Sequence, residues 1–279
     1  MTVDVEATSG LPPYAGMMAA YHEAFAPELR EAVAFAGVRD GDLVVDVACG
    51  DGAYSHWLAE RVGPSGGVVA VDASAAFLEL ARRRVAAASL SDRVGFAQLD
   101  LAHSPLVEGA ADLVWCAQSL YSLPEPVAAL RRLMGLARGG GRVVVFESDE
   151  LHHVILPWPV DIELALRRAE LAAFEAKSDR PSKYYVARDL PRVFREAGLP
   201  NCDIVTVAFN RRAPFDVPTR RFVAAYLADL RERAGPHLEP DARRRFDELV
   251  GQDARGILDD PDSLVVCVDH LAISTLPGG

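Results

Sequence analysis

The chain has 279 residues, half of them hydrophobic and a quarter charged, which is the composition of an ordinary globular protein rather than a disordered or fibrous one. Its formal net charge of −11 repels phosphate backbones and anionic lipid, so we expect neither a nucleic-acid partner nor a membrane partner. Asp4 and Glu6 lie where a secretory signal would be basic and apolar, and no apolar stretch is long enough to cross a bilayer, so we predict a cytoplasmic protein. The four cysteines are far apart and no metal-ligand spacing is visible, so we predict free thiols and no metal site.

The amino-terminal part predicts a helical segment over Tyr14–Gly37, because Met17, Tyr21 and Phe25 can share one apolar stripe. We predict that residues 1–37 form a helical lid.

From Leu43 to Glu147, short β-branched runs alternate with helical stretches, which indicates strand-helix-strand units and a parallel sheet. The predicted strands are Leu43–Ala48, Gly67–Asp72, Val94–Leu99, Ala111–Ala117 and Gly141–Glu147. Helices are expected to begin near Ala53, Ala75 and Pro126, the second capped by Ser74. Residues 38–150 are therefore predicted to form a Rossmann-like core.

After Glu147 the alternation loosens. The later predicted helices lie over Trp158–Ala176, up to Gly198 and over Thr219–Arg255, the last broken at Gly235-Pro236. The later predicted strands are Cys202–Asn210 and Ser263–Ile273. Residues 151–279 are thus predicted to complete the sheet, with an antiparallel final strand, and to add helical insertions that form a cap. The fold class predicted is α/β, a Rossmann-like seven-stranded, mostly parallel sheet with flanking helices and a helical cap.

The most informative segment is Val44–Ser55, where a buried strand ends in small residues and opens directly into a helix. Backbone amides and a helix amino end then face a ligand with no side chain between them. Asp72, at the carboxyl end of the second strand, can accept hydrogen bonds from both hydroxyls of a ribose. Together these features predict an adenosine site.

Two features choose among adenosine-containing cofactors. The dinucleotide fingerprint G-x-G-x-x-G lacks its third glycine here, because Gly50 and Gly52 are followed by residues 53–55 without one. Asp46 would repel a pyrophosphate, and it would suit a cofactor whose amino-acid end carries an ammonium and a sulfonium.

At these residues the sequence resembles the class I S-adenosylmethionine-dependent methyltransferases, whose first motif reads acidic-x-Gly-x-Gly-x-Gly. The match runs through Asp46, Gly50 and Gly52, and it departs at Ala48, where the family usually has glycine. We expect this alanine to reduce the room near the methionine part of the cofactor. The resemblance is strong over Val38–Glu147, and within the class the chain is most similar to the ubiquinone-biosynthesis and type 11 group, which mainly methylates small molecules.

The resemblance implies roles for further residues. Asp72 corresponds to the ribose-binding acid, and Asp100 with Leu101 corresponds to the pair that holds the adenine. Structural roles remain open beside these: a helix-dipole partner for Asp46, a loop cap for Asp72 and a turn cap for Asp100. The predicted cofactor-binding residues are Tyr14, Asp46, Ala48, Gly50, Gly52, Asp72, Ala73, Asp100, Leu101 and Gln118.

The chemical demand on the protein is light, because a sulfonium methyl group is already activated and the enzyme must mainly align the nucleophile and exclude water. A hydroxyl acceptor would also need a base. Candidates are Tyr121 after the fourth strand, and Glu147, His152 and His153 after the fifth. The adjacent histidines are preferred, although both cannot point inward from an extended segment, and a hydrogen-bonded structural role stays open for either.

The sequence thus predicts a methyltransferase that uses S-adenosylmethionine, releases S-adenosylhomocysteine and methylates oxygen, nitrogen or carbon of a small-molecule acceptor, in biosynthetic or secondary metabolism. One alternative is an NAD(P)-dependent oxidoreductase on the same fold, which the missing third glycine disfavours. Another is a non-catalytic protein that binds S-adenosylmethionine. Whether the chain forms a homodimer is left open.

Overall fold

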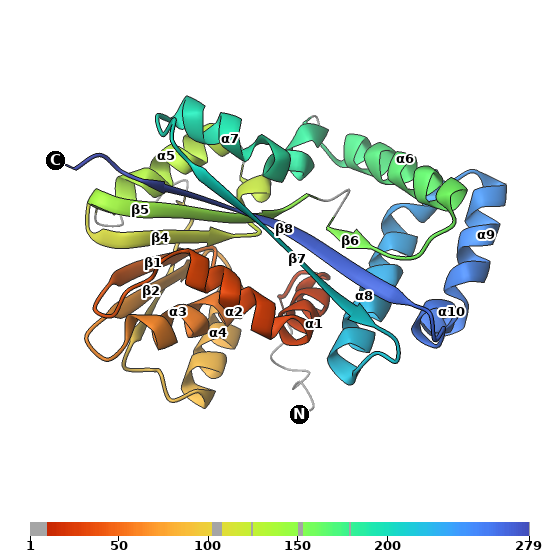
Figure 1. Ribbon diagram of the computed structural model, residues 1–279, viewed down its shortest axis with the longest axis horizontal. Helices are drawn as coiled ribbons and strands as arrows, with labels where there is room; N and C mark the ends of the chain where they lie inside the picture. Colours follow the sequence, from red (N-terminus) through yellow and green to blue (C-terminus); the bar gives the residue numbers. More distant parts are fainter. Residues whose placement is uncertain (1–9, 102–107, 124, 150–152, 179, 279) are drawn as a thin grey trace.

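The computed structural model describes residues 10–101, 108–123, 125–149, 153–178 and 180–278, and its centre is an eight-stranded sheet with helices on both faces (Figure 1). The strands are β1 (Leu43–Val47), β2 (Gly67–Asp72), β3 (Val94–Gln98), β4 (Ala111–Ala117), β5 (Ala137–Ser148), β6 (Val154–Ile155), β7 (Asp203–Arg212) and β8 (Leu264–Thr275). The α-helices are α1 (Ala15–Ala24), α2 (Ala26–Phe35), α3 (Ala53–Val62), α4 (Ala75–Ala87), α5 (Pro126–Leu136), α6 (Val160–Lys177), α7 (Val186–Ala197), α8 (Val217–Arg233), α9 (Pro240–Val250) and α10 (Arg255–Leu258). Short 3-10 helices are η3 (Leu120–Ser122), η4 (Pro181–Tyr185), η5 (Gly235–His237) and η6 (Gln252–Ala254). The predicted α/β Rossmann-like fold is confirmed, with the two-residue β6 added to the seven expected strands.

The strand order places β1 at the centre of a reversal. The sheet runs β3-β2-β1-β4-β5-β8-β6, with β7 on the other edge of β8. Strands β1 to β5 are parallel, whereas β8 is antiparallel to β5 and to β7, as predicted for the final strand. The chain runs from β1 outward to β2 and β3 and then crosses back to β4 on the other side of β1. At such a reversal a crevice forms outside the carboxyl ends of the strands, where ligands bind in open α/β sheets.

Alternating residues of the central strands supply two separate cores. In β4, Leu113 and Trp115 pack with α2, α3 and α4, while Val114 and Cys116 pack with α5 and α7 on the opposite face. This period of two fits a strand that is buried on both faces. The helices of the two faces lie below and above the sheet in Figure 1.

The amino-terminal segment differs from the single helix expected over Tyr14–Gly37. It forms α1 and α2, separated at Phe25, whose φ of −119° and ψ of 20° are not helical. Pro27 lies in the first turn of α2, where its missing N–H costs nothing, but its ring would clash with a continuous helix before it. The bend sends α1 away from the sheet and across the crevice.

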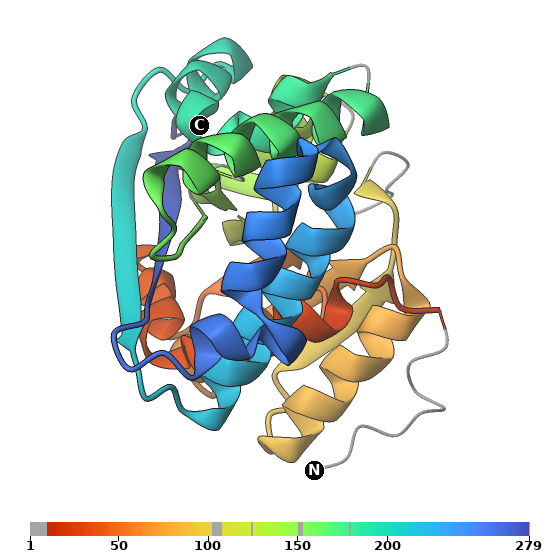
Figure 2. The same ribbon diagram turned by 90° about the vertical axis from the view of Figure 1, so that its right-hand side faces the viewer.

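The carboxyl-terminal half builds a helical layer beyond the parallel strands. The long strands β7 and β8 extend past the end of β5, and α6, α8, α9 and α10 gather beside this extension (Figure 1). Helix α1 packs against α8, as the red and blue helices in Figure 2 show. Among the described residues, no helix is both long enough and apolar enough to span a bilayer.

Candidate functional site

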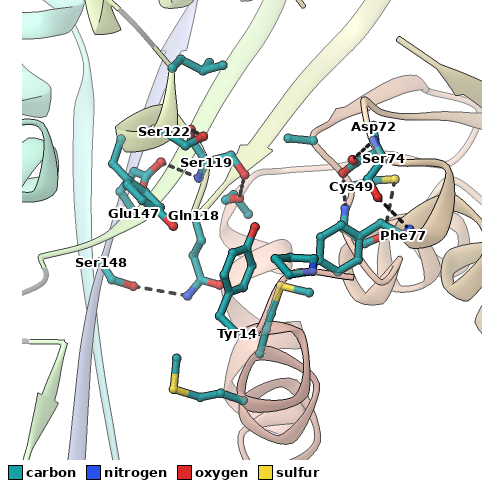
Figure 3. A pocket seen from close by; sticks show the side chains of 18 of the residues that line it. Tyr14, Cys49, Asp72, Ser74, Phe77, Gln118, Ser119, Ser122, Glu147 and Ser148 are labelled. Carbon is teal, nitrogen blue, oxygen red and sulfur yellow. Dashed lines mark hydrogen bonds between the residues drawn. The ribbon is translucent and has the colours of Figure 1, made fainter. Parts of the chain in front are cut away.

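A cavity of about 990 Å³ opens at the carboxyl ends of the parallel strands, between the sheet, α1 and the helical layer. Residues after β1, β2 and β4 line one wall, and residues of α1, α6 and α8 line the other. Figure 3 shows Asp72 and Ser74 on one side of this space, Gln118 and Ser148 on the other, and Tyr14 between them. The cavity therefore lies where the reversal of strand order predicts a ligand.

The turn after β1 is held to the end of β2 by the carboxylate of Asp72. One oxygen of Asp72 accepts a hydrogen bond from the backbone N–H of Gly50 at 2.9 Å, and the other accepts from the backbone N–H of Ser74 at 2.8 Å. Ser74 also caps α4, as predicted, by accepting from the N–H of Phe77. Asp72 is thus fixed at the cavity wall.

The backbone of the same turn has left-handed φ angles, and its residues have small side chains or none. Gly50 has a φ of 53°, and a methyl group added there would lie 3.4 Å from Cε of Met18. Ala48 has a φ of 57°, which explains why glycine is usual at this position of the family's motif. Gly50 and Ala48 form a cradle in which a ligand can approach the main chain closely, as the methionine part of S-adenosylmethionine requires.

Most of the predicted cofactor residues lie together. Those that line the cavity are Tyr14, Ala48, Gly50, Asp72, Ala73, Asp100, Leu101 and Gln118. The side chain of Gln118 donates a hydrogen bond to the hydroxyl of Ser148 at 3.3 Å, and its own φ of 48° is left-handed. Asp100 is exposed at the cavity edge.

Asp46 lies behind the cavity wall rather than in it. Its side chain is buried and accepts a hydrogen bond of 2.5 Å from the hydroxyl of Ser55 on α3. Burial raises the pKa of Asp46 to about 7, with smaller contributions from the negative charges of Asp72 and Asp51. The structure thus shows Asp46 bonding to the first helix turn and gives it no direct place on the cavity surface.

Gly52 is also absent from the cavity wall, and its surroundings explain why the position needs glycine. Its φ is 76°, and an added methyl group would lie 2.6 Å from Cβ and 2.7 Å from Cα of Ala81 on α4. Contacts closer than 3 Å with main-chain atoms cannot be relieved by a side-chain rotation. Gly52 therefore permits α3 and α4 to pack closely.

The far side of the cavity holds a buried carboxylate that binds several polar groups. Asp269 of β8 is fully buried and accepts hydrogen bonds of 2.5 Å from the hydroxyls of Tyr21 and Ser148. The register that pairs Ser148 with Asp269 across β5 and β8 sets the second contact. Nδ1 of His153 lies 3.3 Å from the same carboxylate. At this distance the two groups can form an ion pair when the imidazole is protonated, but the contact lacks hydrogen-bond geometry, so His153 stays a candidate general base.

The other catalytic candidates occupy different positions. Tyr121 lies in η3 and lines the cavity, with its ring centroid 6.1 Å from that of Tyr184. Glu147 lines it too, but one of its oxygens accepts from the backbone N–H groups of Ser119 and Leu120 and so fixes the loop after β4. His152 lies outside the described residues.

Sequence reasoning missed three side chains at this site. Tyr21 had been assigned only to an apolar stripe, yet its hydroxyl bonds to Asp269. His22 lines the cavity, and its Nδ1 lies 3.0 Å from the carboxylate of Asp51, where the positive charges of His22 and Arg84 hold the pKa of Asp51 below its usual range despite burial. Asp269 is the third. Its place in the sequence was the one available signal of this polar cluster, because an acid inside the apolar run Val265–Ile273 must find polar partners when it is buried.

Within the described residues there is no group of three or more histidine, cysteine, aspartate or glutamate side chains that could hold a metal ion.

Part of the sequence is similar to known methyltransferases. Residues 44–141 match the family model described as a methyltransferase domain. A ubiquinone/menaquinone biosynthesis C-methyltransferase from Cellvibrio japonicus is 32% identical over 120 residues, which are 43% of this chain and 48% of that protein. A demethylmenaquinone methyltransferase from Symbiobacterium thermophilum is 29% identical over 190 residues, which are 62% and 74% of the two chains. This chain thus spans about half the length of the first relative.

The fold is likewise similar to that of a SAM-dependent methyltransferase from Aquifex aeolicus, with a TM-score of 0.52 and 20% identity over 70% of this chain and 92% of that one. These findings favour methyl transfer over the oxidoreductase alternative. The resemblance inferred from Asp46, Gly50 and Gly52 is confirmed over residues 44–141, which match a methyltransferase domain, and the chain is similar to a C-methyltransferase of ubiquinone and menaquinone biosynthesis.

Proposed function

We propose that this protein transfers the methyl group of S-adenosylmethionine to a small-molecule acceptor. The observation that supports this most directly is that one cavity contains both a nucleoside-type wall, at Gly50 and Asp72, and a histidine, His153, next to the buried carboxylate of Asp269.

The cofactor fits the first wall. Asp72 would accept from the ribose hydroxyls, the cradle at Ala48 and Gly50 would receive the methionine part, and Asp100 with Leu101 would hold the adenine. When bound, S-adenosylmethionine supplies a methyl group on a positively charged sulfur, which a nucleophile can take without further activation.

The second wall would position and deprotonate the acceptor. His153, next to Asp269, would take a proton from an acceptor hydroxyl or amine, and Tyr21 would help to hold Asp269 in place. Because α1, α6 and α8 line one wall of the cavity, they would limit the access of water to the reacting atoms. The acceptor atom is oxygen, nitrogen or carbon; the name of the Cellvibrio relative gives carbon for that protein.

Two measurements test the proposal. Calorimetry should show saturable binding of S-adenosylhomocysteine, and a panel of small phenols, amines and activated methylene compounds should yield a methylated product detectable by mass spectrometry. Binding without any methylated product would support the non-catalytic alternative. Absence of binding would contradict both.

A further inference from the structure

The chain has only two lysines, Lys177 and Lys183, and both line this cavity. All other basic side chains among the 29 lysines and arginines are arginine. Lys177 is the last residue of α6, and Lys183 lies in η4, which contacts α6. A chain that uses arginine everywhere else has thus placed its two ammonium groups at one site.

Among the described residues, the two lysines are also cations of the cavity with no carboxylate beside them. Arg233 lines the same space, but its guanidinium binds Glu170 at 3.1 Å and Asp229 at 3.1 Å. In the part of the chain that the structure describes, no carboxylate lies within ion-pair distance of Lys177 or Lys183. Lys177 is exposed and Lys183 is half-buried, so both remain accessible to a ligand.

Aromatic rings lie next to these charges. Phe174 and Tyr184 stack with their ring centroids 4.2 Å apart, and Nζ of Lys183 lies 5.1 Å from the centroid of Tyr184. Tyr121, which follows β4, is the next ring in the cluster. This group is therefore on the acceptor side, because the cofactor residues Asp72 and Asp100 follow β2 and β3.

We propose that the methyl acceptor is an acid: a small molecule whose carboxylate or phosphate group is bound by Lys177 and Lys183, while its apolar body contacts the rings of Phe174 and Tyr184. This inference rests on the proposed function and narrows its substrate class. An ammonium is a compact charge with three donors, and it can bind either kind of oxyanion. In a protein with a net charge of −11, an acidic acceptor would be repelled unless positive charge were concentrated where it binds.

The small number of lysines permits a direct test. An amine-acetylating reagent can modify only the amino terminus, Lys177 and Lys183, and mass spectrometry can follow each site separately. On the full-length protein saturated with S-adenosylhomocysteine, benzoate and phenyl phosphate should slow acetylation of both lysines, and benzamide, the neutral counterpart of benzoate, should not. Comparing the protection given by benzoate with that given by phenyl phosphate shows whether the lysines prefer a carboxylate or a phosphate. Equal protection by benzamide, or protection by neither acid, would overturn the proposal.

Variants give an independent measurement. The Lys177→Gln/Lys183→Gln double variant should bind the better acid at least about tenfold more weakly. The matched Lys177→Arg/Lys183→Arg variant should retain binding, and Arg83→Gln on the exposed face of α4 should change nothing. The affinity for S-adenosylhomocysteine should be the same in all four proteins. If the glutamine variant instead loses S-adenosylhomocysteine, the lysines bind the cofactor's own carboxylate and the proposal is wrong. If the wild-type protein does not bind S-adenosylhomocysteine at all, the proposed function itself is contradicted.

Discussion

The backbone N–H of Gly50 donates a hydrogen bond of 2.9 Å to the carboxylate of Asp72, so the turn after β1 and the end of β2 form one unit. The second oxygen of Asp72 is bound by the N–H of Ser74. The carboxylate that is proposed to bind the ribose therefore also shapes the cradle for the rest of the cofactor.

We expect Asp72→Ala to weaken the binding of S-adenosylhomocysteine by more than tenfold, about 1.4 kcal/mol, because it removes the ribose acceptor and the anchor of Gly50 together. Asp72→Asn retains one acceptor oxygen, so its affinity for S-adenosylhomocysteine should lie between those of the wild type and the alanine variant. Calorimetry measures both affinities. Asp92→Ala, an exposed acid away from the cavity, is the control. An unchanged affinity in Asp72→Ala would refute the ribose assignment.

The buried carboxyl of Asp46 predicts an unusual dependence of stability on pH. Its pKa is about 7 in the folded protein, whereas an unfolded aspartate has a pKa of about 3.9. Between these values the folded state binds more protons than the unfolded state, so the contribution of Asp46 to stability is full below about pH 4 and is lost as the pH rises to about 7. Ionisation of this one group therefore destabilises the protein on the alkaline side.

Asp46→Asn removes this penalty because asparagine stays neutral. The difference in unfolding free energy between Asp46→Asn and the wild type should grow in favour of the variant by about 3 kcal/mol between about pH 5 and about pH 8. Urea denaturation at the two pH values measures it. In the Ser55→Ala variant, which loses the hydrogen bond that favours the ionised acid, the decline of stability should extend to higher pH than in the wild type. A difference that does not change with pH would show that Asp46 ionises normally.

Gly50 and Gly52 form a matched pair, since both are left-handed and they differ in what surrounds them. Gly52→Ala should destabilise the protein by about 2 to 4 kcal/mol, because strain in the left-handed conformation adds to the clash with the main chain of Ala81. Gly50→Ala should cost only about 1 to 2 kcal/mol, since the flexible Met18 can move, but it should weaken the binding of S-adenosylhomocysteine. Thermal or urea unfolding together with calorimetry separates the two effects. Equal losses of stability would argue against the packing role of Gly52.

Ala48 allows the reverse substitution, from a left-handed alanine to glycine. Ala48→Gly relieves a left-handed alanine with a φ of 57°, and the gain exceeds the added flexibility of the unfolded glycine. We expect a stabilisation of up to about 1 kcal/mol, together with equal or tighter cofactor binding. A clear loss of stability in the same denaturation assay would mean that the methyl group of Ala48 makes favourable contacts that outweigh its strain.

His153→Gln should lower turnover by at least about a hundredfold on an acceptor that must lose a proton, with little change in the affinity for S-adenosylhomocysteine. The fall in rate of the wild type at acidic pH should also vanish in the variant, which a merely structural histidine would not cause. His56→Gln on α3 is the control, because His56 pairs with Glu60 away from the cavity. Full turnover by His153→Gln would instead favour catalysis by positioning alone.

The amino-acid sequence alone was sufficient to predict the strands and helices of the parallel core. Periodic hydrophobic runs and glycine turns are local features, so β1 to β4 and the starts of α3, α4 and α5 lie within a residue of the positions predicted. The adenosine wall was predictable for the same reason, because Gly50 and Asp72 end consecutive strands and parallel strands bring their carboxyl ends to one edge.

Only the tertiary structure decided the rest of the site. Tyr21 and Asp269 are 248 positions apart, and no local pattern records that the bend at Phe25 brings α1 over β8. Nor does the sequence motif distinguish Gly50, which lines the cavity, from Gly52, which faces Ala81. Local periodicity fixes where strands and helices form, whereas contacts between distant segments depend on how those elements pack. The proposed cofactor wall follows from local sequence patterns, whereas the polar cluster around Asp269 depends on contacts between distant segments.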